Sequence, residues 1–519
     1  MQRTQYDGPS STKRGVAGVL ITNTVWNYAS FAVSLSSNLL LFPFAVAKLG
    51  NTSAGIWLLV GSVSGYMGLL QLGLAPALVQ LAAASIARRE DAAVNRAAST
   101  ALVLVTTLGL AALFALPAIP SLLTLFHVTS EMAPAAATAF VLGIVGVPLQ
   151  MPGHVFNSLL SAAQRQDLCS RAWIFSLFGR FCGIFALLTL GFGLRALMYL
   201  DTVMILLSGS LLAWLAFRTL PDLRFSPAFV NRVDASKLWT LGGWFFVASL
   251  CTLLIEQTDR IVVGAWLTVD DVTHYSAGFK LYMLVFGVAT TMLQAVGPLA
   301  ATLVAREDHE GLRKLFVRMS RYGAAIAIPL ACGVGLGAGL VLRVWMGAGF
   351  ADDYTIVQVL LGSFAVTAYN QVAHAILAAM HRVRQVVWRY SLPQAILNAV
   401  LSIALVSRLG VVGVALGTML PAWLLQYSFT SYTLTAIDMS WRTLFREIVR
   451  PTFLPAVAAF APALAVYASL GPHSWWLVPA LVVGGLAYVA LFWQMLDSAE
   501  RSELRGHVAS YLTRRAEAA

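Results

Sequence analysis

Four charged side chains lie inside apolar segments near the middle of the chain. Glu256, Asp259 and Arg260 belong to one apolar run. Lys280 belongs to the next run. Residues three or four positions apart share one face of a helix, so the first three side chains face the same way. Because a charge within a membrane helix is costly and usually marks a pathway or a partner, these residues are candidates for a functional site.

Asp259 and Lys280 lie at similar depths on either side of the turn between these two runs. At 1.5 Å per residue each is about 10 to 12 Å from the turn, and we expect an ion pair between them. Protonation of the carboxylate would release the pair and favour another conformation, as in a coupling or gating site. The alternative is a permanent ion pair that only joins two helices, and both interpretations are open.

Arg180 and Asp201 are charged residues of two neighbouring apolar runs in the first half of the chain. A guanidinium presents its donors in a planar fork that can hold an anion. Arg180 is therefore either a contact for a negatively charged ligand or the partner of Asp201.

Uncharged polar side chains form a further group of candidates. They lie in the first apolar run and at the cytoplasmic ends of two later ones: Asn23, Trp26, Asn27, Gln150, His154, Asn157, Asn370, Gln371 and His374. Such groups can bind a polar ligand, or they can tie neighbouring helices together through interhelical hydrogen bonds.

The composition shows which kind of fold must position these residues. The 519 residues are 59% hydrophobic and 11% charged, with a mean hydropathy of +0.76. Soluble domains contain roughly 25% charged residues, so this chain needs lipid around it. The net charge of +11 is spread between apolar runs rather than gathered in one patch, which indicates membrane topology and no nucleic-acid partner.

Apolar runs long enough to cross a bilayer recur along almost the whole sequence. The predicted spans are 17–46, 55–82, 98–118, 135–161, 172–190, 196–217, 239–266, 274–304, 322–343, 355–380, 388–407, 412–436, 451–470 and 475–496. Most of the 34 Lys and Arg residues fall on one side of the membrane if both ends of the chain are cytoplasmic. We therefore predict an all-α, polytopic membrane protein with about fourteen transmembrane helices and both termini in the cytoplasm.

The two halves of the chain repeat each other at a distance of 217 residues. ARRED at residues 87–91 resembles VARED at residues 304–308, and LLSAAQR at 159–165 resembles ILAAMHR at 376–382. Each of these segments ends an apolar run. The repeat predicts a duplicated unit of six helices.

We expect two six-helix lobes followed by two additional helices. The first lobe comprises residues 1–220 and the second residues 221–436. Residues 437–519 hold an amphipathic segment, the last two helices and a charged tail. An even number of spans per lobe makes the lobes parallel, and such transporters usually place substrate between repeats that rock against each other. A duplicated scaffold without transport is the alternative.

Motifs in both halves resemble the polysaccharide transporter family, the Wzx-like O-antigen and exopolysaccharide flippases of the multidrug/oligosaccharidyl-lipid/polysaccharide (MOP) superfamily. The motifs are Leu49-Gly50, Gly55-Ile56-Trp57, Leu72-Gly73-Leu74, Asp259-Arg260, Tyr275, Pro298, Trp345-Met346-Gly347, Leu409-Gly410 and Gly413-Val414-Ala415. Gln71 departs from the pattern, because relatives often carry an acidic residue there.

The resemblance implies a flippase for undecaprenyl-diphosphate-linked oligosaccharide in the bacterial cytoplasmic (inner) membrane. It implies transfer from the cytoplasmic to the periplasmic leaflet, with membrane lipid, a polysaccharide polymerase and chain-length proteins as partners. In that case Arg180, Arg260 and Lys280 would form a cationic cavity for the diphosphate. The polar candidates, in which His154 corresponds to Gln371 and Asn157 to His374 at the repeat distance, would bind sugar hydroxyls.

No nucleotide-binding loop, metal-ligand cluster or nucleophile–base motif is evident in the sequence, so we expect neither a cofactor nor an enzyme. Transport would then be coupled to protons or sodium ions through Glu256, Asp259 and Asp201. An ion-coupled multidrug or organic-cation antiporter of the same superfamily is the nearest alternative. A membrane polysaccharide polymerase or ligase is a further one, although such enzymes tend to carry a large outer loop.

Overall fold

The computed structural model describes residues 33–502 apart from residues 35, 72, 292–295, 497 and 499. The described residues form helices and connecting loops, as expected for an all-α protein. The chain divides into two compact units, Met1–Leu250 and Cys251–Ala519. Each unit is considered by itself below.

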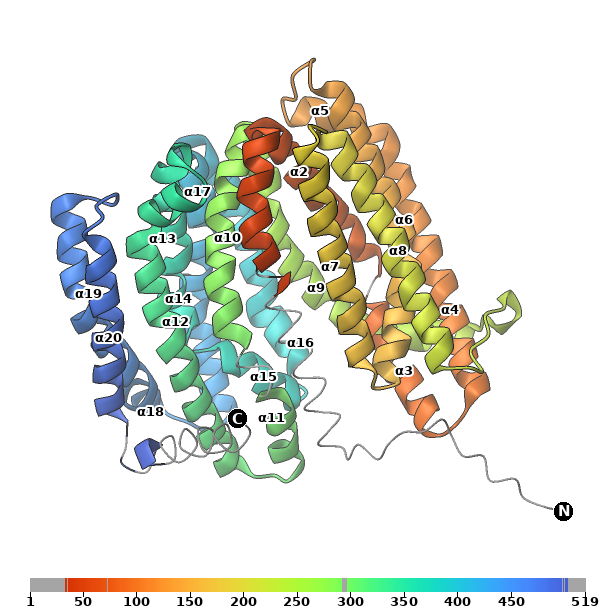
Figure 1. Cartoon of the computed structure of the whole chain (residues 1–519). Coiled ribbons are helices and arrows are strands. Elements are labelled where there is room, and N and C mark those ends of the chain that lie inside the picture. The colour runs from red at the N-terminus through yellow and green to blue at the C-terminus, as the bar shows by residue number, and fades with distance from the viewer. Residues whose placement is uncertain are drawn as a thin grey trace, which may run out of the picture. The chain divides into compact units, whose positions relative to one another are not determined.

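The first unit is built from helices that lie against one another along much of their length (Figure 1). They are Ser36–Leu49, α2 (Asn51–Gly68), α3 (Leu74–Ala87), α4 (Asp91–Ala111), α5 (Ile119–Leu125), α6 (Ala133–Ala162), α7 (Gln166–Thr189) and α8 (Leu194–Thr219). Short 3-10 turns follow α2 and α4: η1 (Leu69–Gln71) and η2 (Ala112–Ala118). Helix α6 packs against both α2 and α8, and α7 packs against α8, so these four helices can enclose a common space.

The second unit has longer and more broken helices. They are α10 (Val269–Thr291), α11 (Val296–Ala305), α12 (His309–Trp345), α13 (Tyr354–Gly362), α14 (Phe364–Thr367), α15 (Gln371–Ala379), α16 (Val383–Val386), α17 (Leu392–Ala436), α18 (Trp441–Leu444), α19 (Arg450–Leu470) and α20 (Leu477–Met495). Helix α9 (Arg232–Trp266) contains the boundary between the units, and its last part, with Glu256, Asp259 and Arg260, belongs to the second.

The described residues include eight helices that are long and apolar enough to cross a membrane, or nine if one bent pair counts as a span. This is a multi-pass membrane protein. The predicted total of fourteen and the parallel arrangement of the lobes stay predictions. The first predicted span, 17–46, begins outside the described residues.

Helix α17 consists of two helical arms rather than one continuous helix. Gly410 has φ 57° and ψ −140° in the middle of α17, a conformation that leaves the helix and that favours glycine. The side chain of Asn398 donates to Thr418 (2.8 Å), and Tyr390 donates to Gln426 (3.4 Å), so the two arms run antiparallel. The two arms match the expected spans 388–407 and 412–436.

The predicted span 355–380 is broken in its middle. Helices α13 and α14 are followed by α15, and the chain bends by 50° at the break. Ser363 and Thr367 donate to the carbonyls of Leu360 (2.7 Å) and Ser363 (3.0 Å), and such bonds within a helix bend it. The bend places Asn370 at the N-terminal end of α15, inside the unit.

Backbone conformation repeats between the two halves of the chain. Gln164 ends α6 with φ 59°, and His381, 217 residues later, follows α15 with φ 57°. Arg89 after α3 and Glu307 after α11 form a second pair, with φ 58° and 57° and a separation of 218. A left-handed conformation is uncommon outside glycine, so its recurrence at matching places supports the internal repeat.

Candidate functional site

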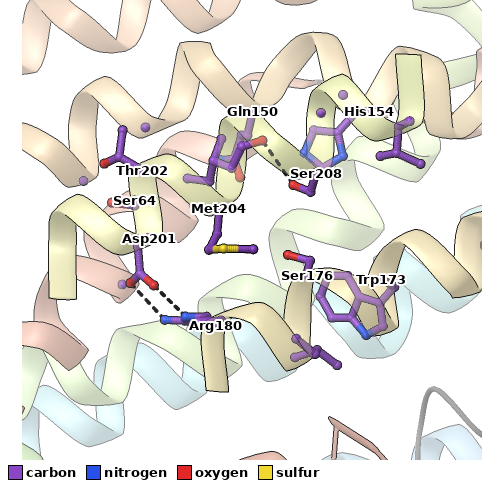
Figure 2. Close-up of a pocket in the computed structure, with 18 of the residues that line it drawn as sticks. Ser64, Gln150, His154, Trp173, Ser176, Arg180, Asp201, Thr202, Met204 and Ser208 are labelled. Atoms are coloured by element: carbon purple, nitrogen blue, oxygen red, sulfur yellow. Dashed lines mark hydrogen bonds and ion pairs between the residues drawn. The ribbon is translucent and has the colours of Figure 1, made fainter. Parts of the chain in front are cut away.

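A cavity of about 600 Å³ lies within the first unit. Helices α2, α6, α7 and α8 all contribute to its wall. In Figure 2, Arg180 and Asp201 face each other toward one end, while His154 and Trp173 lie toward the other. The volume is in the range of small-molecule binding sites, which is ≈ 300–1,000 Å³.

Arg180 and Asp201 form a two-pronged ion pair in the wall of this first cavity. The distances are 2.6 Å from Nε to Oδ1 and 3.0 Å from Nη2 to Oδ2. The indole Nε1 of Trp57 donates to Oδ2 of the same carboxylate (3.3 Å), and the guanidinium lies over the Trp57 ring, 5.5 Å from its centre. Of the two possibilities for Arg180, pairing with Asp201 is the one that the structure contains.

One face of α6 supplies the polar wall of the first cavity. Gln150, His154 and Asn157 lie at helical spacing along it, and Gly153 lies directly before His154. Because Gly153 has no side chain, α6 and α8 approach closely, and an added Cβ there would lie 3.4 Å from Gly209 of α8. The glycines therefore set the width of the cavity, and the polar residues set its chemistry.

A smaller cavity of about 250 Å³ lies within the second unit. Its wall combines polar side chains with aromatic rings, among them Phe279 and Tyr282 on α10 and Phe429 on α17. The ring of His374 stacks on Phe429 (4.6 Å between centres). Glu256 is the acidic residue of its lining. This cavity is smaller than the first, and a larger share of its lining is polar.

Asp259 lies fully buried beside the second cavity, at 0% exposure. Its carboxylate accepts hydrogen bonds from three hydroxyl groups: Tyr275 (2.5 Å), Thr418 (2.6 Å) and Ser402 (3.1 Å). They come from α10 and both arms of α17, so the carboxylate joins α9 to three further segments. The contacts seen at Asp259 are hydroxyl contacts, and the Asp259–Lys280 ion pair stays a prediction.

The side chain of Arg260 contacts Gln257 and Phe279. Its Nη1 donates to Gln257 (2.9 Å) and its guanidinium lies over the Phe279 ring at 5.2 Å. Its Nε has no hydrogen-bond partner among the described residues although it is buried. Arg260 and Arg180 lie in different units, so the expected cationic cavity formed from Arg180, Arg260 and Lys280 also stays a prediction.

The two cavities occupy equivalent positions in the repeat. On α6, the first cavity is lined by Gly146, Gln150, Gly153, His154 and Asn157. The residues 217 positions later all line the second: Ser363, Thr367, Asn370, Gln371 and His374. On α8 the lining residues include Asp201, Ile205, Gly209 and Leu212, and their equivalents Thr418, Ala422, Gln426 and Phe429 on α17 line the second cavity. The repeat seen in sequence is thus a repeat of cavity walls.

The repeat also aligns the polar clusters beside the cavities. Thr418 of the Asp259 cluster is the equivalent of Asp201. On α2 and α10 the separation is 218, which pairs Trp57 with Tyr275. Each of these aromatic residues donates its N–H or O–H to the carboxylate of its own unit.

The structure places most of the predicted site residues at one of these two places. Arg180, Asp201, His154 and Asn157 line the first cavity, whereas Glu256, Asn370, Gln371 and His374 line the second. Trp26 and Asn27 lie outside the described residues, as does Asn23. The roles of all these residues in transport stay predictions.

Sequence reasoning missed the hydroxyl and aromatic partners of the two carboxylates. The missed residues are Trp57, Trp173, Tyr275, Asn398, Ser402 and Thr418. Hydroxyls and aromatic rings are common in membrane helices and give no signal alone. The repeat distance applied to Asp201 would have led to Thr418.

A family model described as a polysaccharide biosynthesis protein matches residues 63–355, more than half of the chain. The chain belongs to the polysaccharide biosynthesis protein family. This membership confirms the resemblance to the Wzx-like transporters that the sequence motifs indicated.

Two relatives in the family carry names that refer to O-antigen. A Shigella flexneri protein named as an O-antigen transporter is 21% identical over 369 residues, which cover 70% of this chain and 85% of the relative. A Yersinia pseudotuberculosis protein named as an O-antigen export protein is 24% identical over 223 residues, 41% of this chain and 50% of the relative.

Solved structures share the fold at low identity. The lipid II flippase MurJ in an inward closed conformation is 11% identical, covers 91% of this chain and 98% of its own, and has a TM-score of 0.69. An inward-facing multidrug resistance transporter of the MATE family is 16% identical, with coverage of 79% and 94% and a TM-score of 0.66. This family member therefore has the fold of the MOP superfamily.

Proposed function

We propose that this protein is a flippase for undecaprenyl-diphosphate-linked oligosaccharide, acting in polysaccharide biosynthesis. The observation that carries the proposal is membership of the polysaccharide biosynthesis protein family. The O-antigen names of its relatives and the fold shared with a lipid II flippase support it. The protein would work in the inner membrane of a bacterium with both termini cytoplasmic, and a polymerase would use the translocated product.

Alternating access is the proposed mechanism. The internal repeat supports it, because such transporters usually expose a central site to each side in turn. The polar walls of the two cavities provide hydrogen-bonding groups for the glycan, and ligand binding would favour one orientation over the other.

Asp259 is the proposed coupling residue. A buried carboxylate whose observed partners are hydroxyl groups carries a large desolvation cost when it is charged. A bound proton or a sodium ion held by surrounding oxygen atoms would remove that cost. Loading and release of the cation would then change the stability of the contact between α9 and the arms of α17.

The test is the location of lipid-linked oligosaccharide in a cell lacking this gene. We expect the intermediate to accumulate on the cytoplasmic leaflet while surface polysaccharide disappears, and we expect the wild-type gene to restore both. Normal crossing of the intermediate in the deleted cell would contradict the proposal.

The second candidate function is ion-coupled export of drugs or organic cations. The structural likeness to MATE family transporters favours it. Higher sensitivity to cationic drugs in the deleted cell, together with unchanged surface polysaccharide, would select this function instead.

A further inference from the structure

The charges of the first cavity cancel within its own wall. Among the described residues that line it, Arg180 and Asp201 are the two with a formal charge, and they hold each other at 2.6 and 3.0 Å. Trp57 donates a further hydrogen bond to Asp201 and lies beneath the guanidinium. The donors of Arg180 that would grip an anion are thus directed at a carboxylate of the protein.

A diphosphate in this cavity would compete with Asp201 for Arg180, because two of the five N–H donors of the guanidinium already bind that carboxylate. Asp201 has a side chain that is 16% exposed, and it would be left as an unpaired carboxylate near a second anion. Removing one partner of a buried ion pair is strongly destabilising, because it leaves an uncompensated charge. The cavity therefore disfavours a dianion.

The remaining polar groups of the wall suit an uncharged ligand rich in hydroxyl groups. Gln150 and Asn157 each offer both donors and an acceptor. Ser176 adds a hydroxyl that can donate or accept, and the hydroxyl oxygens of Thr202 and Ser208 can accept while they donate to the carbonyls of Met198 and Ile205. Groups of both kinds on several sides of one cavity match a molecule whose hydroxyls also donate and accept.

Two indole rings add apolar surface to these polar groups. Trp57 and Trp173 both line the cavity, and Trp173 is 56% exposed. Tryptophan combines a large apolar ring with a polar N–H, and the C–H face of a sugar ring is likewise apolar between its hydroxyls. Mixed polar and aromatic lining in about 600 Å³ suits a short oligosaccharide.

We propose that the first cavity binds uncharged sugar residues of the substrate glycan and that the diphosphate lies outside it. The inference rests on the proposed flippase function and specifies the ligand of this one site. It changes the role of Arg180 from an anion contact to a structural partner of Asp201. The second cavity, which is smaller and has Glu256 in its lining, is not part of this site.

The first arm of the test removes both charges from the cavity. The double variant Arg180→Met, Asp201→Leu replaces both charged groups by apolar side chains and leaves no unpaired carboxylate. We expect it to bind undecaprenyl diphosphate within threefold of wild type, measured with the purified full-length protein in nanodiscs. A loss of tenfold or more, with an unchanged melting temperature, would overturn the proposal.

The second arm measures binding to the full-length protein in nanodiscs. The probes are the radiolabelled repeat-unit oligosaccharide, freed of lipid and phosphate, and undecaprenyl diphosphate without sugar. We expect Trp173→Ala to weaken oligosaccharide binding at least tenfold and Trp173→Phe at most threefold. Neither substitution should alter binding of undecaprenyl diphosphate. Trp475→Ala is the matched control, because Trp475 is 62% exposed and lies between α19 and α20, outside the cavity lining.

Two outcomes would place the diphosphate in the cavity and overturn the inference. One is a tenfold loss of undecaprenyl diphosphate binding in the double variant, and the other is wild-type protein that does not bind the free oligosaccharide. Failure of the proposed function is distinguishable, since the deleted cell would then keep its surface polysaccharide.

Discussion

The two cavities are built by equivalent helices but treat their carboxylates in opposite ways. In the first unit, Asp201 lies on the cavity wall and is held by the guanidinium of Arg180. In the second unit, Asp259 is fully buried behind the wall and is held by hydroxyl groups. The guanidinium of Arg180 thus pairs directly with the first carboxylate, whereas the second is proposed to exchange a proton or a sodium ion. The difference suggests a division of labour, with ligand binding in the first unit and ion coupling in the second.

The hairpins beside the two cavities also achieve close packing in opposite ways. In the second unit an added Cβ at Gly417 would lie 2.3 Å from Ser402 Oγ and 2.6 Å from its backbone nitrogen. In the first unit the glycine is on the other arm, where a Cβ at Gly183 would meet the side chain of Leu200 at 2.7 Å. Leu200 is the repeat equivalent of Gly417, so this position of the repeat has a large side chain in the first unit and no side chain in the second.

The largest effect is expected from adding one methyl group at Gly417. Because the obstacle is backbone, Gly417→Ala should lower the free energy of unfolding by about 3 kcal/mol, the upper part of the range for overpacking. Gly183→Ala is the matched variant, and the flexible end of Leu200 should keep its cost near about 1 kcal/mol. Thermal melting of the two purified variants measures the difference. Equal melting temperatures would show that the two hairpins have the same tolerance.

The next effect concerns Asp259. Asp259→Asn removes the charge that the coupling cation neutralises, and we expect transport to fall about a hundredfold, equivalent to about 2.7 kcal/mol. The measurement is surface polysaccharide at matched protein level, with melting temperature as the control for folding. Full transport by this variant would assign Asp259 a structural role and remove the coupling interpretation.

The ion pair of the first unit should behave differently. Arg180→Met leaves Asp201 unpaired and should destabilise the protein by about 2 kcal/mol, less than a fully buried pair because the Arg180 side chain is 42% exposed. Adding Asp201→Leu should recover most of that loss. Because the two residues are in contact, a double-mutant cycle gives their coupling directly. If the effects of the two substitutions on the free energy of unfolding were additive, the ion pair would contribute nothing to stability.

The smallest effects come from the aromatic donors. Tyr275→Phe removes a hydrogen bond to a buried carboxylate and should cost about 2 kcal/mol, within the range for bonds to charged groups. Trp57→Phe removes the longer bond to Asp201, which retains Arg180, and should cost about 0.5 kcal/mol. Chemical or thermal unfolding in the same detergent compares the two. A larger loss for Trp57→Phe would reverse the ranking of the two sites.

The sequence predicted the features that depend on residue type and spacing. Apolar runs identify membrane helices. The matching segments that end at Arg165 and Arg382 share a further feature, since the residue before each arginine has a left-handed backbone conformation. The intramembrane charges also identified both clusters, since Asp201 and Asp259 are at their centres.

Tertiary partners and helix breaks were beyond such reasoning. Asp259 accepts hydrogen bonds from hydroxyl groups of residues 16 to 159 positions away, and nothing in its local sequence identifies these partners. The bend after Thr367 likewise depends on which hydroxyl groups donate to backbone carbonyls of their own helix. The residue types alone do not show this, since Ser and Thr also occur in straight helices. These choices are made by packing, which one sequence does not reveal.

The π-helical turn Val387–Ser391 (η6) at the start of α17 has a consequence for how the two halves diverged. Buried Ile184 and Leu188 of α7 correspond to buried Ser402 and Val406 at a separation of 218, whereas the preceding loops are 217 apart. A π turn contains one residue more than an α turn, and an extra residue in an unbroken α-helix would rotate everything after it by about 100°. The π turn instead accommodates the extra residue at the point of insertion, so the helix after it keeps its orientation. Homologous proteins should therefore tolerate insertions and deletions at the five positions Val387–Ser391. They should tolerate them almost nowhere else along the arm that carries Asn398 and Ser402.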